Sequence, residues 1–317
     1  MISKIFCLGV VFIFVMLSFS GCVDEDSNFI YVDKGGDGDF LTIQEALDHC
    51  SDGDTIVVRE GVYDELIVID KSVVIMGTNT ANTILTNINQ TSGVLVRINA
   101  DSCTFKGITI DGPGYTTDMN GIEINSSNNV ISSNMIKDTK NGIDLGDGSN
   151  NTRIYGNIIK NNAYGISANR AYDNNISNNE ISSNEYYGIY LHLSNSYIIS
   201  KNDVSDSNTG IRIKGSDNSL VFDNFISDCN GGLYCCCGSG GNKIYNNNFE
   251  NNEDYSGRDD IYNQWDDGKS GNYWDDYIII NPDASSTNGI WDMPYNITSP
   301  YSNESKVDRF PLVNPIK

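Results

Sequence analysis

The 317-residue chain is poor in basic residues, proline and histidine. Lys and Arg total 20 against 42 Asp and Glu, a formal charge of −22, and there are only 6 Pro and 2 His. So acidic a surface repels phosphate backbones, which excludes a nucleic-acid partner as the default. The chain also lacks a phosphate-binding loop, a dinucleotide-binding fingerprint and a Ser/His/Asp nucleophile set. Instead, 42 Asn and 30 Gly separate short runs rich in Ile, Tyr and Phe, which is typical of a turn-rich all-β protein.

Long hydrophobic runs are absent except at the N-terminus. Lys4 precedes an apolar stretch over residues 5–19, which ends in Gly21 and Cys22 and is followed by acidic residues. This order predicts a secretory signal with a lipobox over residues 1–21, lipid modification of Cys22, and a tether over residues 22–28. An ordinary cleaved signal and an uncleaved membrane anchor are the alternatives. All three predict export, and the lipid anchor predicts a protein held at the outer face of the cell membrane.

The middle of the chain repeats with a period of 22–23 residues. A glycine followed by an apolar–x–apolar triplet recurs six times, and an asparagine flanked by Ile-rich positions recurs six times in step with it. The glycines are Gly121, Gly142, Gly165, Gly188, Gly210 and Gly232, and the asparagines are Asn134, Asn157, Asn179, Asn202, Asn224 and Asn247.

Each repeat holds three short β-branched runs separated by Asn, Ser, Asp and Gly, with no room for a helix. This pattern predicts an all-β, right-handed, three-sided parallel β-helix over residues 29–253, with regular coils from about residue 121. Coils stacked about 4.8 Å apart place like residues over like. The asparagines fall where the apolar alternation breaks, so we expect a bend there, with each side-chain amide bonded to the next.

The two ends of the chain differ from the repeat. Thr42 and Glu45 form a capping-box pattern, which predicts a short helix that covers the first coil. Strand-like runs follow at residues 55–58, 66–69 and 73–76. Residues 254–317 are aromatic and acidic and leave the repeat, so we expect an irregular C-terminal cap.

Several segments resemble a known family. Residues 29–77, with GDTIVVREGVY at 53–63 and SVVIMG at 72–77, resemble the start of pectin-lyase-like β-helices. The coils are similar to the NosD-like group, also described as carbohydrate-binding and sugar-hydrolase β-helices. The C-terminal segment resembles the ending of archaeal surface NosD-like proteins, with NQWD at 263–266, GNYWDDY at 271–277, GIWDMPYNI at 289–297 and DRFPLVNP at 308–315. The resemblance implies the fold; it does not imply one activity, although the group takes its name from a copper-related accessory protein.

The resemblance also implies that the outer face of one parallel sheet is a polysaccharide groove. We assign this face to the strands that begin at the repeating glycines, where Tyr rings and Asn amides would stack on sugars and bond to them. Glu123, Asn169 and Tyr234 are the expected ligand-binding residues. The outward columns are Glu123, Asp144, Ser167, Tyr190, Arg212 and Tyr234, and Asn125, Gly146, Asn169, His192, Lys214 and Cys236.

Five residues of this face are candidate catalytic groups. Tyr190 and His192 fall one coil from Arg212 and Lys214, with Asp144 two coils the other way. A Tyr or His beside Arg and Lys can abstract a proton from a uronic acid while the cations neutralise the carboxylate. Two alternatives stay open: Asp144 with its neighbour Glu123 as a hydrolase pair, and a merely solvated face in which Arg and Lys offset carboxylates.

Metal ligands are the next question. Asp283, Asn288 and Asp292 in the C-terminal segment are candidate Ca²⁺ ligands, the alternative being a capping loop held by hydrogen bonds. We expect no required cofactor. Three consecutive cysteines on an extended strand cannot all face one copper ion, and no C-x-x-C spacing is present, so we do not expect copper.

The cysteines permit either disulfides or free thiols in an exported protein. One of them, Cys235, falls in the inward apolar column and should be a small buried hydrophobe, whereas Cys236 should face outward. Beyond Cys7 and Cys22 the set is Cys50, Cys103, Cys229, Cys235, Cys236 and Cys237.

These observations favour an exported, lipid-anchored, monomeric β-helix that binds extracellular or cell-wall polysaccharide along one sheet face. The alternatives are a polyuronate lyase or epimerase acting on that face, a structural surface solenoid, and a copper-handling module. Short turns between the coils favour binding over catalysis, although the longer loop at residues 112–120 could wall one end of a groove.

Overall fold

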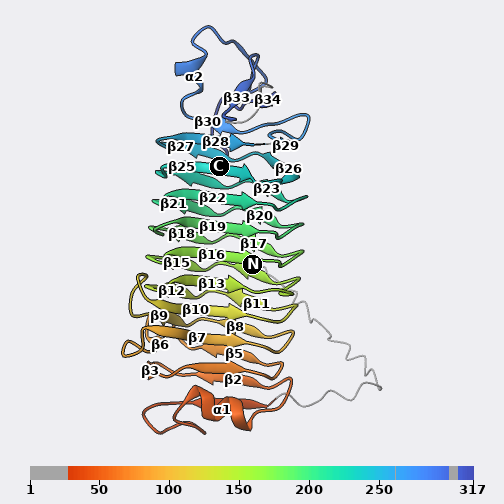
Figure 1. The fold of residues 1–317 in the computed structure, drawn as a ribbon. Helices are drawn as coiled ribbons and strands as arrows, with labels where there is room; N and C mark the ends of the chain where they lie inside the picture. The colour runs from red at the N-terminus through yellow and green to blue at the C-terminus, as the bar shows by residue number, and fades with distance from the viewer. Residues whose placement is uncertain (1–27, 261, 300–305) are drawn as a thin grey trace, which may run out of the picture.

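The computed structural model describes residues 28–260, 262–299 and 306–317. The predicted signal and the lipobox Cys22 lie outside the described residues. The described chain winds around one axis as a right-handed parallel β-helix with three sheets, which confirms the predicted fold class (Figure 1). Within the described part of the chain, no helix is long and apolar enough to cross a membrane.

The strands of the three sheets are parallel throughout, and each complete coil contributes one strand to each sheet. The first coil contributes a strand to one sheet only and the last coil to two, so the sheets have 11, 10 and 9 strands. Sheet A comprises β1 (Phe29–Val32), β2 (Thr55–Val58), β5 (Val74–Gly77), β8 (Thr104–Lys106), β11 (Val130–Ser132), β14 (Arg153–Tyr155), β17 (Asn175–Ser177), β20 (Ile198–Ser200), β23 (Leu220–Phe222), β26 (Gly240–Tyr245) and β29 (Tyr262–Gln264). Sheet B comprises β3 (Gly61–Asp64), β6 (Thr83–Thr86), β9 (Thr109–Asp111), β12 (Met135–Lys137), β15 (Ile158–Lys160), β18 (Glu180–Ser182), β21 (Asp203–Ser205), β24 (Phe225–Ser227), β27 (Asn248–Glu250) and β30 (Tyr273–Trp274). Sheet C comprises β4 (Ile67–Ile69), β7 (Ser92–Ile98), β10 (Asp118–Ile124), β13 (Asn141–Leu145), β16 (Tyr164–Asn169), β19 (Tyr187–His192), β22 (Thr209–Lys214), β25 (Gly231–Cys236) and β28 (Tyr255–Asp259).

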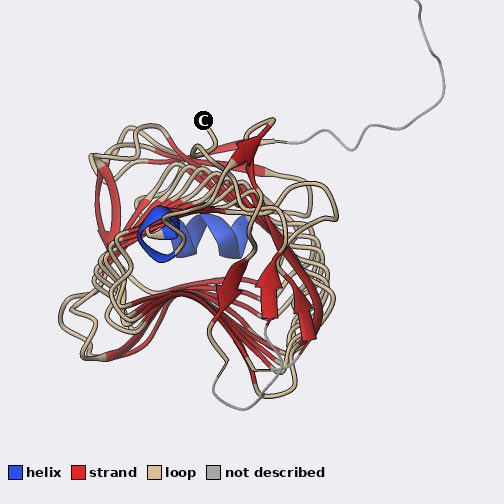
Figure 2. Cartoon of the chain, turned by 90° about the horizontal axis from the view of Figure 1, so that it is seen from above, coloured by secondary structure: helices blue, strands red, loops and turns tan. Residues whose placement is uncertain are grey.

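Stacks of identical apolar side chains fill the interior. In sheet A, Ile131, Ile154, Ile176 and Ile199 lie in register on consecutive strands, and all are fully buried. Viewed along the axis, the coils superimpose around this core (Figure 2). Because the side chains of a strand alternate between faces, the residues between these inward positions form equally regular outward columns.

Helix α1 (Ile43–His49) covers the first coil, as the capping-box pattern predicts. The Thr42 hydroxyl accepts a hydrogen bond from the Glu45 backbone N–H at 3.2 Å. A second acceptor, the Glu65 carboxylate, receives the N–H groups of Ile43 and Gln44 at 2.9 Å each. Glu65 therefore fixes the start of the helix to the solenoid and satisfies its free N–H donors.

The repeating asparagines form a continuous amide ladder at the bend between sheets A and B. The Asn179 side-chain amide and backbone N–H both donate to Oδ1 of Asn202, at 2.9 and 3.0 Å, and the Asn202 amide and N–H donate to Asn224 in the same way. All six members are buried, so the ladder satisfies amide groups that water cannot reach. The ladder comprises Asn134, Asn157, Asn179, Asn202, Asn224 and Asn247 and continues to Asn272.

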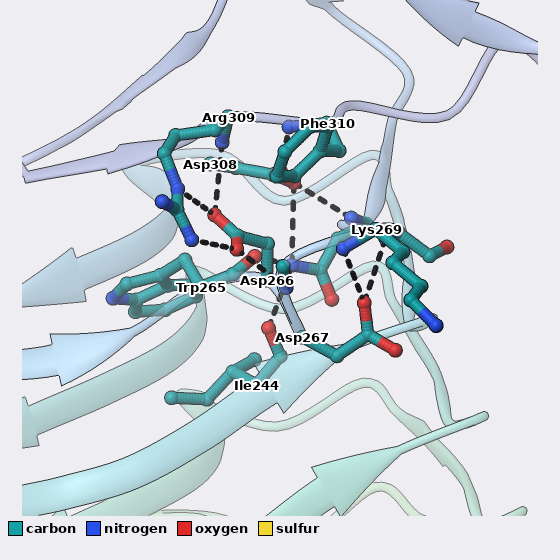
Figure 3. A network of polar contacts seen from close by, with 11 residues as sticks. Ile244, Trp265, Asp266, Asp267, Lys269, Asp308, Arg309 and Phe310 are labelled. Atoms are coloured by element: carbon teal, nitrogen blue, oxygen red, sulfur yellow. Dashed lines mark hydrogen bonds and ion pairs between the residues drawn. The ribbon is translucent and has the colours of Figure 1, made fainter.

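A buried carboxylate ends this ladder. The Asn272 backbone N–H donates to Asp308 Oδ2 at 2.6 Å, and Asp308 also accepts from Trp274 Nε1 and from the Phe310 backbone N–H. Beside it, the Arg309 guanidinium donates to Asp266 Oδ2 at 2.9 Å (Figure 3). The two carboxyl groups differ accordingly. Burial raises the pKa of Asp308 to about 7, whereas Arg309 overcomes burial at Asp266 and lowers its pKa.

The coil after residue 253 still belongs to the solenoid, because β28, β29 and β30 extend all three sheets. The repeat is hidden there because Trp265 and Trp274 fill the core in place of Ile. Phe249, Trp274 and Tyr295 then stack with ring centroids 4.5 and 4.1 Å apart and close the open end. The cap beyond them consists of α2 (Tyr277–Ile280) and the strands β31 (Ser286–Thr287), β32 (Ile290–Trp291), β33 (Tyr295–Ile297) and β34 (Lys306–Asp308).

The ladder can be tested at its centre. We expect Asn202→Ala to lower the free energy of unfolding by at least about 2 kcal/mol, because it leaves the buried N–H and amide of Asn179 without their acceptor. Urea unfolding followed by circular dichroism measures this. Asn89→Ala, at an exposed loop position, is the matched control and should change stability by less than about 0.5 kcal/mol. Equal midpoints for the two variants would show that the ladder does not stabilise the fold.

The carboxylate that ends the ladder predicts a pH dependence. Since the folded pKa of Asp308 is raised from 3.8 to about 7, the folded state binds the extra proton between these values. The free energy of unfolding should therefore fall as the pH rises through this window, by up to about 1.4 kcal/mol per pH unit. Asp308→Asn should flatten this slope in thermal unfolding at pH 5 and 7.5. Parallel stability curves for the two proteins would contradict the assignment.

Candidate functional site

The outer face of sheet C carries the residues that the sequence analysis selected. Tyr190 lies in register with Arg212, and His192 with Lys214, on the adjacent strands β19 and β22. Asp144 is two coils from Tyr190, with Ser167 between them. The central outward column is longer than the repeat indicates. It runs Arg97, Glu123, Asp144, Ser167, Tyr190, Arg212, Tyr234 and Arg258.

Carboxylates occupy the N-terminal end of this column. Arg97 Nε lies 2.9 Å from Glu123 Oε1, and the Asn125 amide donates to the same oxygen at 3.0 Å. Glu123 and Asp144 are direct neighbours on β10 and β13. Burial raises the pKa of Asp144 and the charge of Glu123 raises it further, against a hydrogen bond from Ser167. Glu123 is thus paired with the Arg97 cation, whereas the surroundings of Asp144 raise its pKa.

Four tyrosines cluster at the centre of the face: Tyr164, Tyr186, Tyr187 and Tyr190, here called the tyrosine platform. The rings of Tyr187 and Tyr190 are stacked at 5.0 Å, and Tyr164 lies 5.3 to 6.0 Å from the other three. The His192 ring is nearly parallel to Tyr190 at 6.1 Å. Tyr186 is 47% exposed, so the platform presents aromatic surface to solvent.

The sequence analysis selected Tyr190 but missed the other three members of the platform. Tyr164 and Tyr187 occupy a third outward column, immediately before the repeating glycines Gly165 and Gly188. Both Gly188 and the following Ile189 are buried, so the alternation of faces breaks at the glycine. A search for aromatic residues immediately before each repeating glycine would have found Tyr164 and Tyr187.

The loop before β10 walls one side of the platform. Tyr115 and Thr117 of this loop, with Lys140, Tyr164 and Tyr186, line a cavity of about 350 Å³. The Lys140 ammonium is held at its rim by Asp118, with Nζ 2.8 Å from Oδ1. The long loop at residues 112–120 thus supplies a wall, and the cavity combines aromatic surface with one ion pair.

The candidate catalytic residues differ in orientation and in pKa. The Arg212 guanidinium lies 3.8 Å from the centroid of the Tyr234 ring, which places it over Tyr234 and not over Tyr190. Burial, with a contribution from Tyr187, raises the pKa of Tyr190, so its phenol is a weak base at neutral pH. Burial and the neighbouring Lys214 and Arg170 lower the pKa of His192, which leaves a neutral imidazole as the one proton acceptor of the set.

The expected calcium ligands are spread along a hairpin. Asn288 lies in the turn between β31 and β32 with a φ of 55°, whereas Asp292 lies at the base, where its Oδ1 accepts the Ser285 N–H at 2.9 Å. Asp283 is exposed. Over the described residues, no three His, Cys, Asp or Glu side chains converge on a common point. Asp292 therefore already accepts a hydrogen bond from the backbone of its own hairpin, at Ser285.

The six cysteines of the solenoid carry free thiols. Cys235 points into the core and Cys236 is buried on the outer face, as their columns predict. Cys229 lies in the turn before β25, where its thiol donates to the Ser227 carbonyl at 3.2 Å. Burial raises the pKa of Cys236 to about 12 and that of Cys229 to about 11. Only the Cys237 thiol lies against a second sulfur, 2.9 Å from Cys236 Sγ.

Comparison with known proteins adds a family and a set of fold relatives. A family model described as periplasmic copper-binding protein (NosD) matches residues 47–278. No curated protein sequence matches significantly. The chain is similar to DFA-IIIase from Arthrobacter chlorophenolicus A6 in complex with GF2, at 14% identity and a TM-score of 0.60 over 78% of this chain and 79% of that chain.

Two further solved structures share the fold. The enzymatically active domain of bacteriophage CBA120 tailspike protein 2 is 13% identical, with a TM-score of 0.60 over 72% of this chain and 42% of that chain. The A-module of mannuronan C-5 epimerase AlgE6 from Azotobacter vinelandii is 13% identical, with a TM-score of 0.50 over 74% and 75%. The chain covers 62% of the Dettilon tailspike protein, so it spans less than two thirds of either tailspike. At these identities the similarity shows the parallel β-helix fold alone.

The electrostatics of His192 can be measured directly. Burial, Lys214 and Arg170 all disfavour its protonated form, so its imidazole should titrate below the usual pKa of 6.5. Lys214→Gln should move the midpoint upward in an NMR titration, where His49 supplies the only other histidine signal. Lys243→Gln on sheet A is the control and should leave the midpoint in place. If the titration midpoint of His192 is unchanged in Lys214→Gln, Lys214 does not contribute to the lowered pKa of His192.

Proposed function

The chain belongs to the NosD family, and we propose that within this family it is a surface protein that binds carbohydrate along the outer face of sheet C. The tyrosine platform carries this proposal. Four aromatic rings from two adjacent coils lie in contact on an open face, where aromatic side chains pack against the apolar faces of sugar rings. Polar groups beside them, such as Ser167 and Asn169, can fix the orientation of the sugar.

Two features favour binding over catalysis. The turns between coils are short, so the face is open except at the loop of residues 112–120. Arg212 is directed toward Tyr234, away from the proposed base Tyr190. The fold relatives include a tailspike domain named as enzymatically active and a mannuronan epimerase, and their fold supports polysaccharide as the ligand class.

The copper in the family's description finds no matching donor set in the described residues. Copper(I) favours thiolate and thioether ligands, and a site needs several of them directed at one ion. Here Cys235 faces the core and Cys229 bonds to a carbonyl, so only Cys236 and Cys237 lie together. No group of three or more His, Cys, Asp or Glu side chains in the described residues could hold a metal ion. We therefore assign no copper chemistry to this part of the chain.

Location follows from the N-terminal segment. We propose export and anchoring through a lipid at Cys22, as the lipobox pattern indicates. Strand β1 begins at Phe29 at the α1 end of the solenoid (Figure 1). An anchor seven residues before it would hold that end at the membrane and direct the rest of sheet C outward to polysaccharide.

The proposal is tested by the retention of purified full-length protein on a panel of neutral and acidic polysaccharides in affinity electrophoresis. Tyr190→Ala should weaken binding roughly tenfold, because it removes one stacking ring. Tyr155→Ala, an outward tyrosine on sheet A, is the matched control and should bind as wild type.

Three results would contradict this proposal. Equal retention of wild type and Tyr190→Ala would move the binding surface away from the tyrosine platform. Release of new reducing or unsaturated ends during incubation, lost in Asp144→Asn, would identify an enzyme on this face. Absence of retention on every polymer would leave the solenoid as a structural element.

A further inference from the structure

An unusual stack of side chains continues the face of sheet C beyond the tyrosine platform. Arg212, Tyr234 and Arg258 occupy the same outward column on the consecutive strands β22, β25 and β28. The guanidinium carbon of Arg212 lies 3.8 Å from the centroid of the Tyr234 ring, and that of Arg258 lies 4.4 Å from it. We call this the Arg–Tyr–Arg stack.

Contacts with neighbouring side chains fix the central ring of the stack, Tyr234. Tyr234 is only 8% exposed, and its hydroxyl donates to Asp260 Oδ2 at 2.9 Å. Tyr255 meets the edge of the same ring at 5.9 Å and contacts Thr209 through its hydroxyl at 3.4 Å. Both guanidinium groups are therefore positioned by packing and cation–π contacts with a fixed ring.

Neither arginine has a carboxylate partner within the described residues. The ion pairs of the structured chain use Arg59, Arg97, Lys137, Lys140 and Arg309. In contrast, the Nε atoms of Arg212 and Arg258 are buried and donate to no protein acceptor. The chain has 42 acidic and 20 basic residues, so carboxylates are in excess. Arg212 and Arg258, two coils apart in one column, nevertheless have no carboxylate partner among the described residues. Arg212 has a side-chain hydrogen bond with Cys236 but no carboxylate. Because burial removes part of the hydration of both guanidinium groups, an external anion can stabilise their charge.

Further cations lie beside the stack. Lys214 is on the same strand as Arg212 and is in register with His192. The His192 carbonyl accepts a hydrogen bond from the backbone N–H of Arg170, on the neighbouring coil, at 3.1 Å. The acidic residues of the face, Glu123 and Asp144, lie on β10 and β13 at the other end of the platform. Along the axis the face thus passes from Glu123 and Asp144 through the tyrosine platform to the two arginines. The Asp260 carboxylate lies beside these arginines, bonded to the Tyr234 hydroxyl.

We infer that the Arg–Tyr–Arg stack is an anion subsite, which binds the carboxylate or sulfate group of an acidic glycan whose sugar rings lie on the tyrosine platform. The inference rests on the proposed function and adds its ligand class. Planar guanidinium groups form paired hydrogen bonds with carboxylate and sulfate oxygens. Arg212 is in register with Tyr190 on the adjacent strand, so the anion subsite begins one coil from the tyrosine platform.

The test compares matched polymers that differ only in charge. Polygalacturonate is compared with its fully methyl-esterified form, and dextran sulfate with dextran, each against the purified full-length protein. Wild type should bind an anionic polymer at least tenfold more tightly than its neutral partner, and the preference should shrink as salt is added. Which pair shows the larger ratio identifies the carboxylate or the sulfate as the bound group.

Arg258→Gln and Arg212→Gln should each reduce this ratio severalfold and leave the affinity for the neutral polymer unchanged. Arg153→Gln is the matched control, because Arg153 also lies over a tyrosine ring, at 5.4 Å from Tyr155, but on sheet A. Thermal unfolding verifies that each variant folds.

The outcomes separate the two proposals. If wild type retains neutral and anionic polymers equally, or if both arginine variants keep the full preference, the anion subsite is wrong and the carbohydrate-binding face stands. If Tyr190→Ala binds all polymers as wild type does while Arg258→Gln loses the anionic ones, the ligand is recognised by charge and the tyrosine platform is not its binding surface. If no polymer is retained, both proposals fail.

Discussion

From Asn134 onward, each coil is kept in register with the next by a side-chain amide at the bend between sheets A and B. At a bend the strands end, and backbone N–H groups there would lose their partners. Each ladder asparagine accepts the N–H and the amide of the coil before it, so Asn157, for example, donates twice to Asn179 Oδ1 at 3.0 Å. A coil shifted by one residue would bury these groups unpaired, which costs about 1–3 kcal/mol for each. The ladder therefore fixes the register on which the inward and outward columns depend.

A ladder of aligned N–H donors needs an acceptor after its last member. A second column, Asn242 and Asn263, ends on a buried carboxylate just as the main ladder does. Asn242 donates to Asn263, and the Asn263 N–H and amide donate to the two oxygens of Asp259 at 3.0 and 2.9 Å. Asp308 has the same position after Asn272. Both carboxylates are fully buried and both also bind a Trp indole N–H. The last coil thus joins the amide ladders to the aromatic side chains that close the core.

The repeat was predictable from the sequence because identical residues stack on identical residues, so that Ile154 is directly above Ile131 in both the spacing and the structure. The same logic placed Tyr190 beside Arg212 and His192 beside Lys214. It failed where the period changes: Arg258 lies in a coil whose core is made by Trp265 and Trp274, and Asp308 reaches Asn272 only through the path of the cap, 36 residues later. It also failed to place Asn288 and Asp292, because a hairpin separates residues that are close in sequence.

The outward column of sheet C obeys a constraint that the core does not have. Neighbouring strands are about 4.8 Å apart, so identical charges on adjacent coils repel each other. The column has three solutions to this problem. Glu123 is paired with Arg97, its neighbour Asp144 has a raised pKa, and the two arginines Arg212 and Arg258 are separated by the ring of Tyr234, which attracts both. The first solution pairs a charge within the protein, and the second makes ionisation of Asp144 less favourable. The third keeps two positive charges intact and two coils apart, and for this reason it is the part of the face where the fold leaves charge for an external anion.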